Sequence, residues 1–138
     1  MLDLGGLRKA VESLERATKV ASFRIKDKVN TDEQEVIRAG VIQNFEFTYE
    51  LCWKFMKRWL EININSVTVD GITRKELFRL AGEHQIIADV EAWFGYNKLR
   101  NETLHTYDND TADDVYKMAV CFVADARALL TALELKND

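Results

Sequence analysis

The sequence contains no proline and only six glycines. All-β domains need many tight turns, and turns draw on these two residues. Their scarcity therefore predicts a fold built from a few long helices. The chain has 138 residues, which fits one domain with a single hydrophobic core. Its hydrophobic share of 47 % and charged share of 30 % are typical of globular rather than disordered chains.

Cysteines and long apolar runs are also scarce. Cys52 and Cys121 lie in apolar helical patterns, without CxxC spacing or a neighbouring histidine. This predicts two reduced core residues in a cytosolic protein. The N-terminus, "MLDLGGLRKAVESLERA", lacks the basic start and apolar core of a signal peptide. No stretch approaches the ~20 apolar residues of a membrane span, so we expect a cytoplasmic protein with no membrane segment.

Several signatures of catalysis and binding are missing. The sequence has no glycine-rich phosphate loop, no G-x-S-x-G and no H-E-x-x-H, and it suggests no cofactor. The net charge of −4 argues against the broad basic surface that binds duplex DNA. A small RNA site remains open, because such a site needs only a few well-placed cations.

Capping patterns and apolar spacing divide the chain into helices. Thr31 followed by Gln34, and Thr73 followed by Glu76, have the spacing of capping boxes. Gly82 is a predicted helix stop, and Asp110 or Thr111 is expected to cap the last helix. The "ININSVTVDGI" segment is interpreted as a loop.

Together these signals predict an all-α fold, an antiparallel four-helix bundle with one extra short helix. The single domain spans residues 1–138. The helices are expected over residues 4–28, 31–61, 75–81, 87–104 and from about 111 onward. On the last helix, the residues at helical spacing are Val115, Met118, Ala119, Phe122, Ala126, Leu129 and Leu133.

The segment "RNETLHTY", residues 100–107, ends the fourth long pattern. The helix that this segment ends carries a stripe of apolar residues along one side. The polar residues Asn97 and Arg100 interrupt that stripe. Polar groups on an inward face are costly unless they are paired, so Arg100 should contact a carboxylate or a ligand phosphate. Glu46 and Glu50, stacked one turn apart on the second helix, would repel each other unless a cation lay between them. Arg100 is the predicted cation.

The relation of Arg100 to His105 is open at this point. On an ideal helix the two side chains lie about 140° apart, whereas Asn101 and His105 share a face. Arg100 and His105 could converge if the helix ends near His105 or if the site lies between subunits. The alternative is structural, with Arg100 paired to a core glutamate and His105 at a helix C-terminus.

A metal site is a further alternative for this segment. Glu102 and His105 have the Glu-x-x-His spacing of di-iron bundles, but those sites need two such motifs and two further glutamates. This chain has one motif, because Ala81 stands where His84 would need its glutamate. We therefore expect no metal, and we expect His84 to be an exposed loop residue.

The motif and the second helix together resemble a known family. "RNETLHTY" is similar to the Arg-x4-His-x-Tyr motif of the HEPN superfamily, small helical bundles that include toxin ribonucleases. "GVIQNFEFTYELCWKFMKRWLE" resembles the matching helix of the HEPN branch called nucleotidyltransferase substrate-binding proteins. The helical context suits this family across nearly the whole chain.

The resemblance implies a homodimer in which the Arg and His of both subunits line a shared cleft. In toxin members the motif cleaves RNA without metal, and a minimal nucleotidyltransferase acts as antitoxin by adding AMP to the motif tyrosine. Carried onto this chain, the catalytic roles fall on Arg100, His105 and Asn101, and the AMP acceptor is Tyr107. Glu46 and Glu50 would support Arg100.

Two functions remain open from the sequence. One is a toxin ribonuclease silenced by its nucleotidyltransferase partner. The other is a non-catalytic subunit that presents a substrate to that partner, or a plain interaction bundle.

Overall fold

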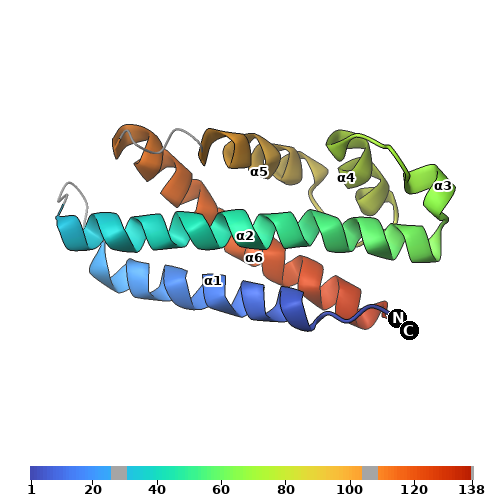
Figure 1. Cartoon of the computed structure of the whole chain (residues 1–138), viewed down its shortest axis with the longest axis horizontal. Coiled ribbons are helices and arrows are strands. Elements are labelled where there is room, and N and C mark those ends of the chain that lie inside the picture. Colours follow the sequence, from blue (N-terminus) through green and yellow to red (C-terminus); the bar gives the residue numbers. More distant parts are fainter. Residues whose placement is uncertain (26–30, 104–108, 138) are drawn as a thin grey trace.

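Six α-helices and no strand make up the described part of the chain (Figure 1). The computed structural model describes residues 1–25, 31–103 and 109–137. The helices are α1 (Gly5–Arg24), α2 (Asp32–Asn63), α3 (Ser66–Val69), α4 (Arg74–Glu83), α5 (Val90–Glu102) and α6 (Asn109–Leu135). The predicted all-α antiparallel bundle is confirmed, and α3 is a helix that the sequence did not predict.

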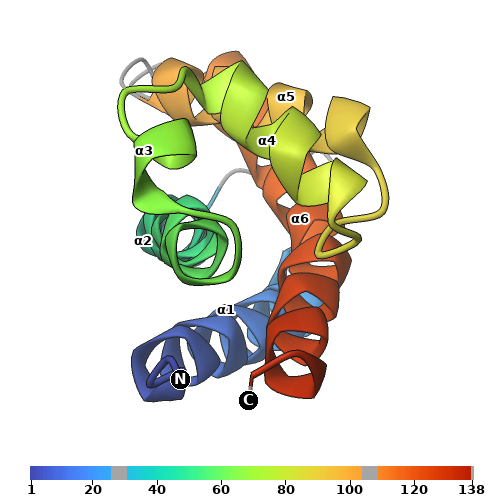
Figure 2. The ribbon, with the colours of Figure 1, turned by 90° about the vertical axis from the view of Figure 1, so that its right-hand side faces the viewer.

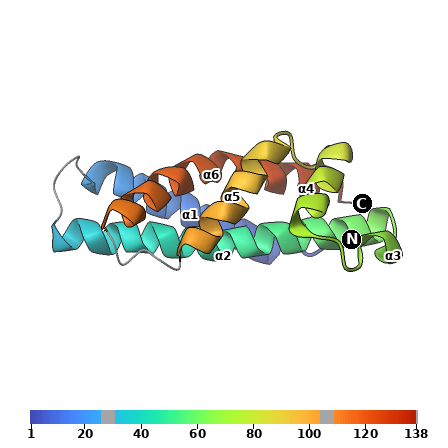
Figure 3. The ribbon, with the colours of Figure 1, turned by 90° about the horizontal axis from the view of Figure 1, so that it is seen from above.

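The longest helix, α2, is the axis of the molecule (Figure 1). Helix α1 lies along α2, and α6 crosses both of them, so that these three helices pack together (Figure 2). Helices α4 and α5 pack on each other and on α2, and α5 also packs on α6 (Figure 3). The two termini lie side by side, where the Asn137 side chain exchanges two hydrogen bonds of 2.9 Å with the backbone of Leu2.

An aromatic cluster joins α2, α5 and α6 in the core. The Phe122 ring of α6 meets Phe45 of α2 edge-on, with centroids 5.1 Å apart. The same ring meets Trp93 and Tyr96 of α5 at 5.5 and 4.9 Å. Edge-to-face pairs of this kind add stability beyond the area that they bury. The cluster therefore fixes where α5 lies relative to α2, which decides the site described below.

The predicted helix starts at Thr31 and Thr73 are confirmed. The Thr31 side chain accepts a hydrogen bond from the Gln34 N–H, and Thr73 accepts one from Glu76 N–H. Each bond satisfies one of the N–H groups that a helix start leaves without a partner. Asp89 caps α5 in the same way through Ala92.

Two predicted helix ends were wrong. Helix α4 continues through Gly82 to Glu83, and the left-handed residue beyond it is Gln85, with φ of 61°. Gly82 lacks a side chain for a different reason, because a Cβ there would lie 2.5 Å from Cγ2 of Val90. Asp110 and Thr111 lie inside the first turn of α6, which begins at Asn109, so neither residue caps it.

The segment interpreted as a loop contains α3. Its β-branched residues argue against a helix, but the Asn65 side chain accepts a hydrogen bond of 2.6 Å from the Thr68 N–H. Burial of Val69 holds the turn against the bundle. A local cap and one buried side chain thus override the weak helix propensity of this sequence.

Two residues predicted in the core of the last helix lie on its surface. Cys52 is buried, but Cys121 is exposed, and Met118 is exposed as well. Both residues point away from the side of α6 that meets the other helices. Their apolar character alone does not tell whether they face the core or the solvent. His84 is exposed, as expected. None of the helices in the described ranges is long and apolar enough to cross a membrane.

Candidate functional site

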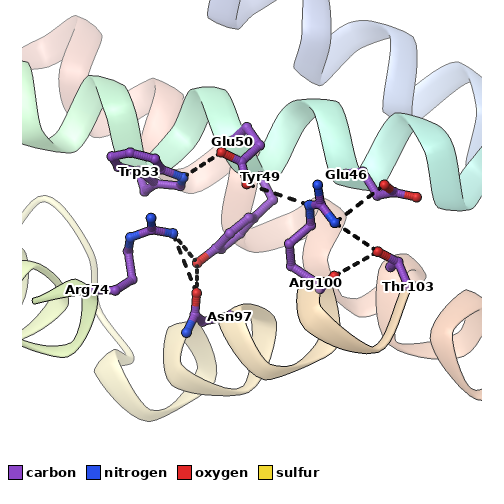
Figure 4. Close-up of polar contacts among 8 residues, drawn as sticks. All are labelled: Glu46, Tyr49, Glu50, Trp53, Arg74, Asn97, Arg100 and Thr103. Carbon is purple, nitrogen blue, oxygen red and sulfur yellow. Dashed lines mark hydrogen bonds and ion pairs between the residues drawn. The ribbon is translucent and has the colours of Figure 1, made fainter. Parts of the chain in front are cut away.

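Arg100 of α5 lies between the two stacked glutamates of α2 (Figure 4). Its Nη1 is 3.5 Å from Glu46 Oε2, and its Nε is 3.5 Å from Glu50 Oε1. The side chain of Arg100 is 28 % exposed, so the group is neither free in solvent nor sealed in the core. This ion-paired arrangement of Arg100 is the one predicted from the spacing of the residues on the two helices.

The guanidinium is loosely held. Charge-assisted hydrogen bonds to a carboxylate normally measure about 2.7–2.9 Å, and both contacts of Arg100 are longer. Arg127, by comparison, grips Glu15 with two nitrogens at 2.9 and 2.5 Å. The Arg100 Nε is buried without a hydrogen-bond partner among the described residues. Arg100 therefore keeps donor capacity that its carboxylate neighbours do not use.

The last turn of α5 orients Arg100. The Nη1 of Arg100 donates to the Thr103 hydroxyl at 3.0 Å, and that hydroxyl donates to the Arg100 carbonyl oxygen at 2.7 Å (Figure 4). Thr103 itself is buried. Thr103 thus holds the guanidinium in one orientation at the C-terminal end of α5, next to residues 104–107 of the motif.

A second polar network adjoins the glutamates. Trp53 donates from its indole N–H to Glu50 Oε2 at 3.0 Å, and the Arg74 guanidinium lies 3.7 Å from the Trp53 ring centroid. Arg74 also donates to the Tyr49 hydroxyl at 3.2 Å and to Asn97 Oδ1 at 3.4 Å. These contacts link α4 to α2 and α5 (Figure 4).

Tyr49 is a neutral member of this network. Its hydroxyl donates to Asn97 Oδ1 at 2.8 Å. Burial raises the pKa of Tyr49 to about 12, although the hydrogen bond from Arg74 opposes part of that rise. At neutral pH the phenol is therefore a hydrogen-bond donor that stabilises the position of α5 against α2.

A surface hollow opens beside Arg100. Its volume is about 320 Å³, and its lining residues come from α2 and α5. They are Gln43, Glu46, Phe47, Glu50, Leu51, Lys54 and Arg100. Phe47 is 62 % exposed, which is unusual for an aromatic ring. The hollow thus combines two cations and two carboxylates with an exposed aromatic ring.

The predicted site residues divide into three groups. Arg100, Glu46 and Glu50 come together. Asn101 is described and exposed, but none of its contacts tests a catalytic role. His105 and Tyr107 lie outside the described residues.

Sequence reasoning missed Arg74 and the bond between Tyr49 and Asn97. Asn97 carried a signal, because a polar residue on an inward stripe needs a buried partner. Arg74 carried none, since it follows the cap Thr73 like any exposed residue of a first turn. Its position on Trp53 is a tertiary contact that only the packing of α4 on α2 produces.

Metal ligation is the alternative role for the Glu102-x-x-His105 spacing. Glu102 is exposed, and His105 lies outside the described residues. Within the described ranges no three residues of His, Cys, Asp or Glu gather in a way that could hold a metal ion.

Residues 2–135 match the family described as nucleotidyltransferase substrate binding protein like. The chain belongs to this family. The match spans almost the whole sequence and agrees with the HEPN resemblance of the motif and of the second helix.

Similar proteins extend this assignment. A Haemophilus influenzae protein named "Probable ribonuclease HepT" is 38 % identical over 106 residues, which cover 76 % of this chain and 73 % of that protein. A solved structure from the same species, described as revealing the fold of a substrate binding domain of a nucleotidyltransferase, is 36 % identical. It superposes with a TM-score of 0.88 over 96 % of this chain and 99 % of its own.

A crystal structure of a protein from Thermus thermophilus is also similar. It is 25 % identical, covers 90 % of this chain and 98 % of its own, and has a TM-score of 0.68. A similar helical arrangement is therefore found in a protein that is 25 % identical to this chain.

Proposed function

We propose that this protein is a metal-independent ribonuclease that acts through Arg100 and His105. The observation that carries the proposal is the loosely held Arg100 guanidinium, partly exposed beside a hollow and five residues before His105. The identity of 38 % to a protein named as a probable ribonuclease supports it. In toxin members of the HEPN superfamily, the motif that "RNETLHTY" resembles cleaves RNA.

The chemistry needs a phosphate-binding cation and a proton carrier. Arginine has a planar fork that binds two phosphate oxygens at once, and Arg100 has donor capacity to spare. Histidine, with an unperturbed pKa of ~6.5, exchanges protons near neutral pH. The imidazole removes the proton of the 2′-hydroxyl, whose oxygen attacks the phosphorus, and the imidazolium that forms protonates the departing 5′-oxygen.

The Arg100 and the His105 that act together can come from two protomers. We therefore propose a homodimer in which the ends of both α5 helices line one cleft, so that each subunit supplies an Arg100 and a His105. A two-fold axis would bring identical segments together in this way. This arrangement also removes the angular separation of Arg100 and His105 on a single helix.

Growth inhibition tests the ribonuclease. Expression of the protein alone should arrest growth, and Arg100→Ala or His105→Ala should relieve the arrest. Arg8→Ala is a matched control, because Arg8 forms an exposed ion pair with Glu134 away from the site. The purified protein should cleave RNA in the presence of EDTA, and neither site variant should do so. Harmless expression of the wild-type protein would contradict the proposal.

The partner proposed for this protein is a minimal nucleotidyltransferase that adds AMP to Tyr107 and thereby acts as antitoxin. An adenylyl group two residues beyond His105 would fill the cleft with bulk and negative charge. Co-expression with the enzyme should raise the intact mass by one or more AMP units. Tyr107→Phe should abolish the increase, whereas Tyr116→Phe, on α6, should retain it. An unchanged mass of the co-expressed wild-type protein would exclude the modification.

A second candidate is a non-catalytic subunit that presents a substrate to the nucleotidyltransferase. The balanced charge of the hollow favours it, since Glu46 and Glu50 offset Arg100 and Lys54. In that case RNA would remain intact, and Arg100→Ala would weaken the binding of the nucleotidyltransferase substrate without relieving any growth arrest. Because either function requires RNA or nucleotides, we propose a cytoplasmic location.

A further inference from the structure

Three cations of α4 lie over aromatic rings. The Arg74 guanidinium is 3.7 Å from the centroid of Trp53 on α2. Phe94 of α5 lies under two cations, with Arg79 at 5.4 Å and Lys75 at 5.8 Å from its centroid. Contacts of this kind hold a cation at the surface without neutralising its charge.

These cations are not matched by carboxylates. No Asp or Glu of the described residues lies within 4.0 Å of Arg74, Lys75 or Arg79. Arg8 and Arg24, on α1, do form such pairs. Lys75 and Arg79 are exposed, and they are four residues apart on one side of the helix.

The distribution of charge along the chain agrees with an excess of positive charge around α4. Residues 51–100 hold eight Lys or Arg and six Asp or Glu, although the whole chain has a net charge of −4. The part of the molecule that contains α4 and α5 is thus the basic part of an acidic protein. Arg74, Lys75, Arg79 and Arg100 all belong to this part of the sequence.

A chain of side-chain contacts connects Arg74 to the Arg100 site. Arg74 contacts Trp53, Trp53 donates to Glu50, and Glu50 is the ion-pair partner of Arg100 (Figure 4). The packing of α4 on both α2 and α5 keeps these groups adjacent. Arg74 is therefore linked to Arg100 by three successive contacts, and Lys75 and Arg79 follow Arg74 on α4.

We propose that Arg74, Lys75 and Arg79, with Trp53 and Phe94 beneath them, form a surface that binds the backbone of single-stranded RNA leading away from the Arg100 site. This proposal rests on the proposed ribonuclease function and extends it. Cations that track the nucleic-acid backbone are one element of sequence-independent single-strand binding, and here the two aromatic rings hold those cations in place. The surface holds the strand, while Arg100 and His105 act on the bond that is cleaved.

RNA binding can be measured without cleavage in a His105→Ala background. The probe is a labelled oligoribonucleotide of about 20 nucleotides, longer than the ~16 nucleotides that a small single-strand module covers. Lys75→Glu with Arg79→Glu should weaken binding about tenfold at low salt. The same change should make the dependence of log affinity on log salt shallower by about 0.7 for each phosphate that the variant no longer neutralises. Lys75→Gln with Arg79→Gln should have a smaller effect in the same direction.

The matched control is Lys9→Glu with Arg16→Glu. These residues are exposed cations on α1, and their reversal changes the net charge by the same amount. The control should bind RNA as the parent protein does. Equal loss in both pairs would show an effect of net charge alone and would overturn the proposed surface, as would unchanged binding in the α4 variants.

A short substrate separates this proposal from the ribonuclease proposal. With His105 restored, the α4 variants should cleave a dinucleotide, which is too short to reach α4, as fast as the wild-type protein does. Failure of the wild-type protein to cleave any RNA would overturn the proposed function, yet the binding measurement would still test the surface. Loss of nucleotidyltransferase binding with full RNA binding would overturn the RNA surface and assign α4 to the partner protein.

Discussion

Arg100 and Arg127 both have carboxylate partners, but those partners bind the two guanidinium groups with different tightness. Arg127 meets Glu15 with two short contacts, which lower the pKa of Glu15 and raise that of Arg127. Arg100 divides its charge between two glutamates at 3.5 Å, and among the described side chains it donates a hydrogen bond to Thr103 alone. A guanidinium held in this way is oriented but remains able to accept an anion.

Removing one competing carboxylate should increase the affinity of the site for anions. Glu50→Gln keeps an oxygen for the Trp53 indole and removes one negative charge beside Arg100. Ion pairs this exposed contribute up to about 1 kcal/mol, so RNA binding in a His105→Ala background should strengthen by up to about fivefold. Fluorescence anisotropy of a labelled oligoribonucleotide would measure this change in affinity.

The corresponding control is Glu134→Gln, which frees Arg8 at a distance from the hollow. It should leave RNA affinity unchanged. Weaker binding by Glu50→Gln would mean that the carboxylate contributes to the bound state instead of competing with it.

Tyr49 connects the site to the stability of the protein at alkaline pH. Its folded pKa of about 12 lies above the ordinary value of 10.0. Below pH 10 the phenol is neutral in both states and adds no pH dependence. Between pH 10 and 12 only the unfolded state loses the proton, so stability should fall by up to about 1.4 kcal/mol per pH unit.

Urea unfolding at pH 8 and pH 11 would measure this dependence. Tyr49→Phe should be less stable than the wild type at pH 8 by about 1–3 kcal/mol, because Asn97 loses a buried hydrogen-bond donor. The variant should also lose less stability on going to pH 11. Tyr96, whose pKa burial also raises, remains in both proteins, so their difference isolates Tyr49.

At the scale of the helices, Gly82 is a glycine that close packing between helices requires, and not one that ends a helix. Gly82→Ala should destabilise the protein by about 1–3 kcal/mol, because its Cβ would lie 2.5 Å from Val90 Cγ2. The helix propensity of alanine acts in the opposite direction. Thermal unfolding would measure the change, and adding Val90→Ala should recover part of the loss.

Gly95→Ala is the comparison within α5. Apart from the adjacent residues and the backbone of its own helix, a Cβ at Gly95 would meet no atom of the described residues within 4 Å. The helix propensity of alanine should therefore stabilise the protein by up to about 1 kcal/mol. Destabilisation by both substitutions to the same extent would show that contact with Val90 is not the cause at Gly82.

The sequence predicted features that depend on neighbours along one or two helices. The caps at Thr31 and Thr73 depend on a spacing of three residues within one helix. The position of Arg100 was predicted because it interrupts an apolar stripe on its helix and because two stacked glutamates on the second helix need a cation. Features set by packing between helices were not predictable. Arg74 on Trp53 and the exposure of Cys121 both depend on how one helix is rotated against another, which apolar patterns define only coarsely.

At the scale of the whole molecule, the aromatic cluster around Phe122 positions the site. Phe122 contacts residues of both α2 and α5, the helices that supply Glu46, Glu50 and Arg100. The site is thus assembled by the core, and the α5 helix presents its C-terminal end, beside the motif, at one place on the surface. A second protomer could use that end without changing the bundle.

Mixed dimers test whether two protomers share one catalytic cleft. Arg100→Ala and His105→Ala homodimers should each be inactive. After the two variants exchange subunits, a mixed dimer keeps one Arg100 and one His105 in the shared cleft, so RNA cleavage should return in part. The measurement is the cleavage rate before and after exchange, with each variant exchanged against itself as the control. If every cleft lay within one protomer, each subunit of the mixed dimer would lack one of the two groups, and the mixture would stay inactive.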